Sequence, residues 1–374
     1  MNFRLLPLLA AALLLGSCAR QSSTIKIGEY ASLTGKEAGF GQTSHRGIVM
    51  AVEEINAAGG VLGKKLELIT EDNQTKAGES ATAAKKLLSR DRVIALIGEV
   101  SSSRSLEAAP VAQAAKVPMV APAATNEKVT QVGDYIFRVC FIDPFQGQVM
   151  AKFAHEELKA RRVALLSSVS NAYSLGLARV FKETFTASGG EIATEKSFSE
   201  GDKDFRAQLT AIKAASVEAI FVPSYYTEAA LIVRQARDLG ITAPFFGGDG
   251  WEDEQLLKIG GDAMNGCYYS THFSAQNTDP AVAEFVERYR QRWNGEIPGA
   301  FAALGYDSVY VLVDALKRAG TAEGPALRDA LAATKDVAGV TGRTTLDRDR
   351  NASKPATLIA IRDGKLNFHR TAAP

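Results

Sequence analysis

Hydroxyl-bearing side chains follow two successive strand-like runs in the first half of this 374-residue chain. The apolar run 93–97 leads into Gly98-Glu-Val-Ser-Ser-Ser103, and the run 119–121 leads into Pro122-Ala-Ala-Thr-Asn126. Hydroxyl groups and free backbone N–H groups at the start of a helix can bind a small anion such as a carboxylate. Helix capping would explain either segment alone, so an anion site and ordinary capping both remain open.

Aromatic and acidic residues follow the strand-like runs of the second half. An acidic residue beside a buried strand can face a cation, and tyrosine supplies a flat apolar wall with a polar tip. The Asp-Gly pair at 249–250 would by itself indicate a turn. Together with the anion donors of the first half, however, the pattern predicts a site for a zwitterion whose ammonium faces Asp249. The residues concerned are Tyr173 after the run 163–167, Tyr225 after 219–222 and Asp249 after 244–246.

The elements that must position these residues alternate between short β-rich runs and helical stretches from Ile25 onward. Apolar residues in the helical stretches recur at spacings of three and four, as at Ile48, Val52 and Ile55. Such βα alternation predicts parallel sheets covered by helices on both faces, which bind ligands beyond the carboxyl ends of their strands. One series precedes about Asp143 and another follows it, so we expect an α/β body with two lobes.

The C-terminal part departs from this alternation. No linker rich in serine and glycine separates the two series, which indicates that the chain crosses between the lobes more than once. Successive helices are predicted at 281–293, 302–317 and 325–333, followed by short strands around Thr344, at 357–361 and at 365–369.

Charge and motif patterns exclude several function classes. The chain has 43 basic and 42 acidic side chains, so the basic surface of a nucleic-acid-binding protein is not expected. The serines at 101–103 lie outside a G-x-S-x-G motif, and Gly63-Lys64 departs from the phosphate-binding loop pattern. The four histidines are scattered without the spacing of metal ligands. We therefore expect no enzymatic activity, no metal and no cofactor.

The N-terminal segment has the pattern of an export signal. Arg4 precedes an almost wholly apolar run from Leu5 to Leu15, which is too short to span a bilayer. The sequence then ends in Gly16-Ser17-Cys18, which resembles a bacterial lipobox. We expect residues 1–17 to be a signal peptide, Cys18 to carry lipid and residues 18–24 to form a tether. An ordinary secretion signal that contains a cysteine is the alternative.

The same segments, in the same order, resemble the branched-chain amino-acid binding proteins, a periplasmic binding family that serves ABC importers for leucine, isoleucine and valine. The resemblance runs from Ile25 to about the C-terminus. It is carried by Ile97-Gly98 with Ser101-Ser-Ser103, Pro118 to Asn126, Phe137-Arg138 with Asp143 and Gln146-Gly147, Tyr173 with Gly176 to Arg179, Gly201 to Phe205, Tyr225, Arg234 to Arg237, and Gly261-Asp262.

The resemblance implies a bilobed fold of the type I periplasmic binding proteins. Two doubly wound parallel-sheet lobes would be joined by three hinge crossings, near 140–143, near Phe273 and near 355–357. The expected N-terminal lobe comprises residues 25–142 and 274–355, and the expected C-terminal lobe comprises 143–273 and 356–374.

The resemblance also implies binding residues. Ser102, Ala123 and Thr125 match the carboxylate and amine contacts of the first lobe, and Asp249 stands where better-known members have a glutamate for the ammonium. Side-chain contacts are implied for aromatic residues, namely Tyr173, Tyr225, Phe301 and Phe40. Two departures are visible: Ser101 and Gln74 replace a cysteine pair of some members, and the shorter Asp249 precedes Trp251, which would alter the depth of the pocket.

Two cysteines remain besides Cys18. Cys140 and Cys267 each lie in a strand-like run, and an oxidising compartment would permit a disulfide between them. Two buried free thiols are the simpler interpretation. The implied crossings put both residues near the hinge, which keeps the disulfide open as an alternative.

The expected function is that of an extracytoplasmic solute-binding protein. It would capture an α-amino acid, aliphatic or branched-chain, between two lobes and deliver it to an ABC permease. We expect a monomer, anchored to a membrane through its lipid. The alternative is a sensor or receptor on the same fold, for an amide, urea or another small polar ligand.

Overall fold

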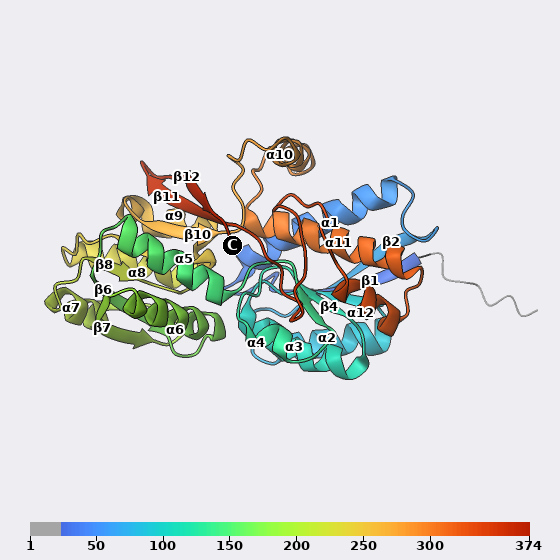
Figure 1. Ribbon diagram of the computed structural model, residues 1–374, viewed down its shortest axis with the longest axis horizontal. Coiled ribbons are helices and arrows are strands. Elements are labelled where there is room, and N and C mark those ends of the chain that lie inside the picture. Colours follow the sequence, from blue (N-terminus) through green and yellow to red (C-terminus); the bar gives the residue numbers. More distant parts are fainter. Residues whose placement is uncertain (1–23) are drawn as a thin grey trace, which may run out of the picture.

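The structure is a computed structural model that describes residues 24–374. The predicted signal peptide, Cys18 and the tether up to Ser23 lie outside the described residues. Two β-sheets with their covering helices form two lobes that lie side by side (Figure 1). Within residues 24–374, none of the helices is both long enough and apolar enough to cross a membrane.

The first lobe contains a five-stranded sheet. Helices α1 and α11 pack together on one side of it, and α2 and α3 pack together on the other (Figure 1). In chain order its elements are β1 (Thr24–Ala31), α1 (Ala38–Ala57), β2 (Lys65–Asp72), α2 (Glu79–Lys86), a π-helical turn (Leu87–Asp91), β3 (Ala95–Ile97), α3 (Ser102–Ala115), β4 (Met119–Ala121), α4 (Lys128–Gln131) and β5 (Ile136–Arg138).

The second lobe contains a seven-stranded sheet. Its elements are α5 (Asp143–Glu156), β6 (Arg162–Ser168), α6 (Ala172–Ala187), β7 (Glu191–Phe198), α7 (Arg206–Ala214), β8 (Ala219–Phe221), α8 (Tyr226–Asp238), β9 (Phe245–Gly247), the 3-10 turn Asp249–Trp251, α9 (Glu254–Gly260), the 3-10 turn Gly261–Met264 and β10 (Tyr268–Thr271), followed after the C-terminal helices by β11 (Ala356–Arg362) and β12 (Lys365–Ala372).

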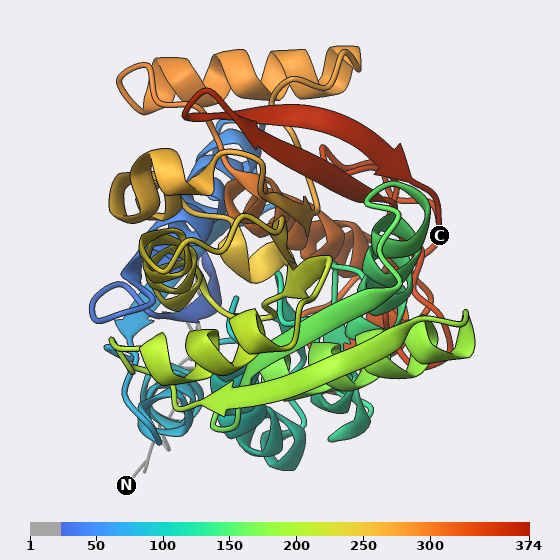
Figure 2. The ribbon, with the colours of Figure 1, turned by 90° about the vertical axis from the view of Figure 1, so that its left-hand side faces the viewer.

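Both sheets use the same strand order. The first sheet runs β2-β1-β3-β4-β5, and the second contains the corresponding series β7-β6-β8-β9-β10. All of these neighbours are parallel, whereas β11 and β12 add antiparallel strands beside β10. Figure 2 shows β11 and β12 as a long red ribbon across the top of the second lobe. In the first sheet the chain places β2 on one side of β1 and β3 on the other, and in the second it places β7 and β8 on either side of β6. Each sheet therefore has a switch point, between β1 and β3 and between β6 and β8, where a ligand can bind.

The chain passes between the sheets three times. It leaves the first sheet after β5, returns after β10 and leaves again before β11. Between the last two passages lie α10 (Pro280–Arg292), α11 (Ala300–Ala319) and α12 (Gly324–Ala332). Helix α10 joins the first lobe through Arg288, which donates to Glu54 of α1 at 2.9 Å. The antiparallel strands and the returning helices explain why βα alternation stops in this part of the sequence.

Two glycines allow α1 and α11 to lie unusually close. A Cβ on Gly47 would stand 1.9 Å from the backbone oxygen of Ala302, and a Cβ on Gly305 would stand 2.4 Å from that of Ser44. Any side chain at either position would force the helices apart. The close packing matters because α11 begins at the cleft and carries Phe301 there.

Three sequence-based element predictions need correction. Thr24, predicted as the end of the tether, pairs with Lys65 as the first residue of β1. The strand predicted around Thr344 is wrong: a single bridge to Val337 is present, because the chain turns at once through Gly342. The sequence predicts a helix over 177–185, but α6 begins earlier, at Ala172, since Asn171 caps it by accepting from the backbone N–H of Ser174 at 3.1 Å.

The two cysteines are both buried and free. Burial raises the pKa of Cys140 to about 12 and that of Cys267 to about 11. Cys267 precedes β10 beside Arg237 rather than near the hinge, so the placement that favoured a disulfide is wrong. Both thiols are protonated at neutral pH and are poor nucleophiles.

A buried ion pair fixes the third crossing to α11. Lys354, next to the crossing, donates to Asp307 of α11 at 3.3 Å, and both side chains are almost inaccessible to solvent. The Asp307 carboxylate also accepts from the backbone N–H groups of Val340 at 2.8 Å and Thr341 at 3.0 Å. Removing one member of such a pair leaves an uncompensated charge in the interior.

We predict that Asp307→Ala lowers the free energy of unfolding by about 3–5 kcal/mol, because Lys354 and two backbone donors lose their acceptor. Urea unfolding followed by circular dichroism measures the change. Asp314→Ala is the matched control on the same helix, where the half-exposed pair with Arg318 should contribute only about 0.3–0.5 kcal/mol. Equal losses in the two variants would contradict the role assigned to the buried pair.

Candidate functional site

The carboxyl ends of the two sheets face each other across one cavity. All eight residues singled out from the sequence line it, together with Val100 and Gly250. The cavity is small and is lined by residues of both lobes. The lining residues are Phe40, Val100, Ser102, Ala123, Thr125 and Phe301 from the first lobe, and Tyr173, Tyr225, Asp249 and Gly250 from the second.

The first lobe offers hydrogen-bond donors and hydroxyls. Ser102 is the first residue of α3, where backbone N–H groups have no partner within the helix. Its hydroxyl accepts from the backbone N–H of Asn126 at 3.2 Å and so joins the segments that follow β3 and β4. Thr125, from the second of these segments, is 1% exposed. This side of the cavity suits an anion.

Aromatic rings form the walls. Phe40, near the start of α1, meets Tyr225 and Phe301 edge to face with ring centroids 5.1 and 5.0 Å apart. Tyr225 in turn stacks on Tyr173 at 5.4 Å. The rings come from both lobes, so the apolar wall is complete only when the lobes are together.

Asp249 supplies a carboxylate on the side of the second lobe. It follows β9 and is 3% exposed. Gln146 donates to its Oδ1 at 2.9 Å, and Nε2 of His272 lies 3.0 Å from its Oδ2. The hydroxyl of Tyr173 accepts from the backbone N–H of Gly250 at 3.0 Å, which fixes the turn that carries Asp249.

A second acidic residue, Asp143, is buried in the same region without lining the cavity. Burial raises the pKa of Asp143 well above its ordinary value, and the nearby Asp249 adds to the shift. Burial and Asp249 likewise raise the pKa of Tyr173. Asp249 lines the cavity and Asp143 does not, so Asp249 is the acidic side chain placed to meet a ligand.

Direct contacts between the lobes show that the structure is closed. The hydroxyls of Ser101 and Tyr225 are 3.0 Å apart, and Asn126 donates to the backbone oxygen of Ala172 at 2.7 Å. At another edge of the interface, Lys36 forms an ion pair with Glu200 at 3.0 Å. Ser101 thus makes a contact across the cleft.

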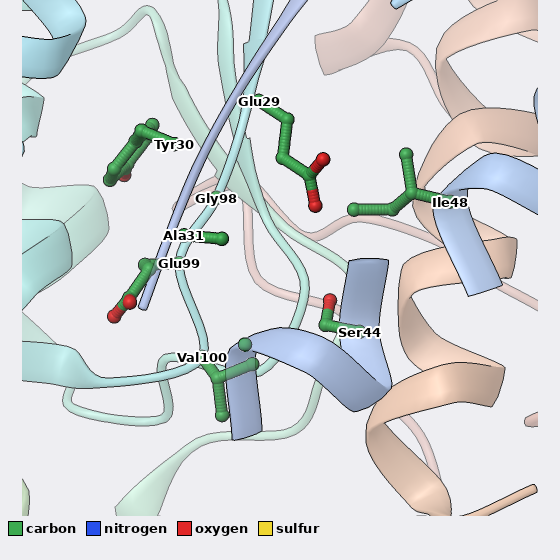
Figure 3. Close-up of a pocket in the computed structure, with 9 residues that line it drawn as sticks. Glu29, Tyr30, Ala31, Ser44, Ile48, Gly98, Glu99 and Val100 are labelled. Carbon is green, nitrogen blue, oxygen red and sulfur yellow. The ribbon is translucent and has the colours of Figure 1, made fainter. Parts of the chain in front are cut away.

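A second cavity of similar size lies beside the first one, inside the first lobe. Figure 3 shows the Glu29 carboxylate pointing from β1 toward Ser44 and Ile48 of α1. One oxygen of Glu29 binds His45 at 2.6 Å, whereas the other has no hydrogen-bond partner. Val100 lines both cavities. Nothing in the sequence pattern had indicated this second cavity.

Sequence reasoning missed the two residues that contact Asp249. In the sequence, Gln146 belongs to a Gln-Gly motif of the family resemblance, and His272 is one of four scattered histidines. A signal was present for His272, because it follows a strand directly, as the predicted site residues do. Within residues 24–374, no group of three or more His, Cys, Asp or Glu side chains is placed to hold a metal ion.

Comparison with known proteins gives a consistent family. A sequence model described as periplasmic binding protein matches residues 24–365. The leucine-, isoleucine-, valine-, threonine- and alanine-binding protein of Pseudomonas aeruginosa is 32% identical over 333 residues, which are 88% of this chain and 88% of that protein.

Two solved structures share the fold along nearly the whole chain. A leucine-binding protein from Thermotoga maritima is 38% identical with a TM-score of 0.89, covering 94% of this chain and 99% of that one. The branched-chain amino acid transporter substrate-binding protein of Streptococcus pneumoniae, solved with isoleucine, is 36% identical with a TM-score of 0.89, covering 94% and 100%. These matches confirm the bilobed type I fold and a family of binding proteins rather than enzymes. The chain therefore belongs to the periplasmic binding proteins, in the branched-chain amino-acid binding family that its motifs resemble.

Proposed function

We propose that the protein captures an α-amino acid with an aliphatic side chain between its lobes and delivers it to an ABC permease. The observation that carries the proposal is a cavity between the lobes, with hydroxyls and a helix N-terminus on one side and the Asp249 carboxylate on the other. An α-amino acid has the two charges that this arrangement can bind. Periplasmic binding proteins of ABC importers work outside the cytoplasm, which agrees with the predicted export signal.

The head group would bind to both lobes. Ser102 and Thr125, with the free N–H groups of α3, would bind the α-carboxylate, and Ala123 would offer its backbone beside them. The Asp249 carboxylate would accept from the α-ammonium. Charge-assisted hydrogen bonds of this kind are about twice as strong as neutral ones.

The side chain would lie against aromatic rings. The apolar walls of the cavity are formed by four aromatic residues, Phe40, Phe301, Tyr173 and Tyr225. Among the residues that line the cavity, Asp249 is the one with a carboxylate. A second charge on the ligand would have no partner there. The relatives named above as binding leucine, isoleucine and valine support this side-chain class.

Binding would act through a population shift between open and closed forms. An open form would expose each half of the site to water, and the ligand would bind both halves only when the lobes are together. A ligand can shift such an equilibrium only by its difference in affinity for the two forms. The contacts of Ser101 with Tyr225 and of Lys36 with Glu200 would then stabilise the closed form that a permease recognises.

The same scaffold could instead serve a sensor or a receptor for an amide or urea. Such a ligand lacks an ammonium and would not need Asp249. Asp249 is buried at the cavity wall, where Gln146 and His272 contact its carboxylate. A carboxylate in this position favours a ligand with a cationic group, such as the ammonium of an amino acid.

We also propose that the mature protein is a monomer anchored through lipid on Cys18, with residues 1–17 removed. The expected lobes, 25–142 with 274–355 and 143–273 with 356–374, are supported by the pairing of β11 with β10 and by the packing of α11 on α1.

Asp249→Ala should weaken binding of L-leucine by at least about 2 kcal/mol, because the ammonium loses its buried partner. Isothermal titration calorimetry measures the loss. Asp262→Ala, an exposed acid of the same lobe outside the cavity, is the control and should bind like the unmodified protein. Unchanged affinity in Asp249→Ala would reject the amino-acid assignment and favour a ligand without an ammonium.

Cys18→Ala should move the protein from the detergent phase to the aqueous phase when membranes are extracted with Triton X-114, because the lipid attachment site is lost. Immunoblotting of the two phases measures the distribution. Cys140→Ala removes a buried thiol and should stay in the detergent phase with the unmodified protein. An aqueous distribution of the unmodified protein would show that the signal is an ordinary secretion signal.

A further inference from the structure

We propose that His272 is a positioning residue for ligand binding, which orients the Asp249 carboxylate and connects the ammonium site to the hinge. The inference deepens the proposed function and rests on it. It begins from the observation that a residue of one hinge crossing contacts the acidic side chain of the cavity directly, while lying outside the cavity lining itself.

The Asp249 carboxylate is held at both oxygens. Gln146 of α5 donates to Oδ1 at 2.9 Å, and Nε2 of His272 lies 3.0 Å from Oδ2. The side chains of Asp249 and His272 are 4% and 1% exposed, so water cannot substitute for either contact. Two fixed donors on opposite oxygens prevent the carboxylate from rotating.

The hydrogen-bond network assigns the tautomer of His272. Its Nδ1 is buried without a partner, so a proton there would be an unsatisfied buried donor. The proton is therefore assigned to Nε2, which donates to Asp249. In this form the imidazole is neutral and leaves the negative charge of Asp249 available to the ligand. Each carboxylate oxygen can still accept another hydrogen bond, so an ammonium can join the two existing donors.

His272 also belongs to the hinge. It directly follows β10, at the second crossing, and its ring stacks on Phe141 with centroids 3.8 Å apart and planes inclined by 26°. Phe141 precedes α5, at the first crossing. The series Asp249, His272 and Phe141 thus runs from the ammonium site through the second crossing to the first. A rotation of the lobes that disturbed the stack would also disturb the orientation of the carboxylate.

A double-mutant cycle with L-leucine as the ligand tests the proposal. If His272 acts through Asp249, His272→Leu should raise the Kd about 10-fold, within the range of coupling between hydrogen-bonded neighbours. His272→Gln should keep binding within about 2-fold, since its amide can donate from the position of Nε2. In an Asp249→Ala background, His272→Leu should change the Kd by less than about 2-fold, because the group to be oriented is absent.

Calorimetry supplies the Kd values, and thermal unfolding shows whether each variant is folded. His369→Gln is the matched control, since this histidine binds Glu157 on the surface rather than a cavity residue and should leave the Kd unchanged. A His272→Leu variant that binds as tightly as the unmodified protein would overturn the proposal. So would an equal loss with and without Asp249, or a loss that His272→Gln fails to restore. Failure of the unmodified protein to bind L-leucine would reject the proposed function instead.

Discussion

Binding in the cleft depends on the burial of two opposite charges between two lobes. A charge taken out of water is costly unless it meets a partner with good geometry, and an α-amino acid carries two such charges a short distance apart. The first lobe has donors for the carboxylate, and the second has Asp249 for the ammonium. Neither lobe alone can satisfy both, so the ligand and the closed form would stabilise each other.

The fold meets this constraint through the repetition of one strand order. The order β2-β1-β3-β4-β5 of the first sheet corresponds to the order β7-β6-β8-β9-β10 in the second, and both sheets turn the carboxyl ends of these strands toward the cleft. The loops after β3 and β4 therefore face those after β6, β8 and β9. The returning helix α11 completes the site with Phe301, and its close packing on α1 at Gly47 holds that ring against Phe40. Side chains from distant parts of the sequence meet because each follows a strand end.

The sequence was sufficient to predict the α/β class, most elements and the residues around the cavity, since strand ends and family motifs are local patterns. It was insufficient where a role depends on a partner far along the chain. His272 follows a strand as the other site residues do, but its contact with Asp249 exists only after the fold brings the two residues together. The absence of a strand at Thr344 and the separation of Cys140 from Cys267 likewise follow from the path of the chain rather than from composition.

A crystal structure of the protein with L-leucine bound would show whether both lobes hold the head group of the ligand. We expect closed lobes, with the α-carboxylate at Ser102 and Thr125 and the α-ammonium within hydrogen-bond distance of Asp249. A ligand bound to one lobe only, or an ammonium that contacts a group other than Asp249, would contradict this expectation.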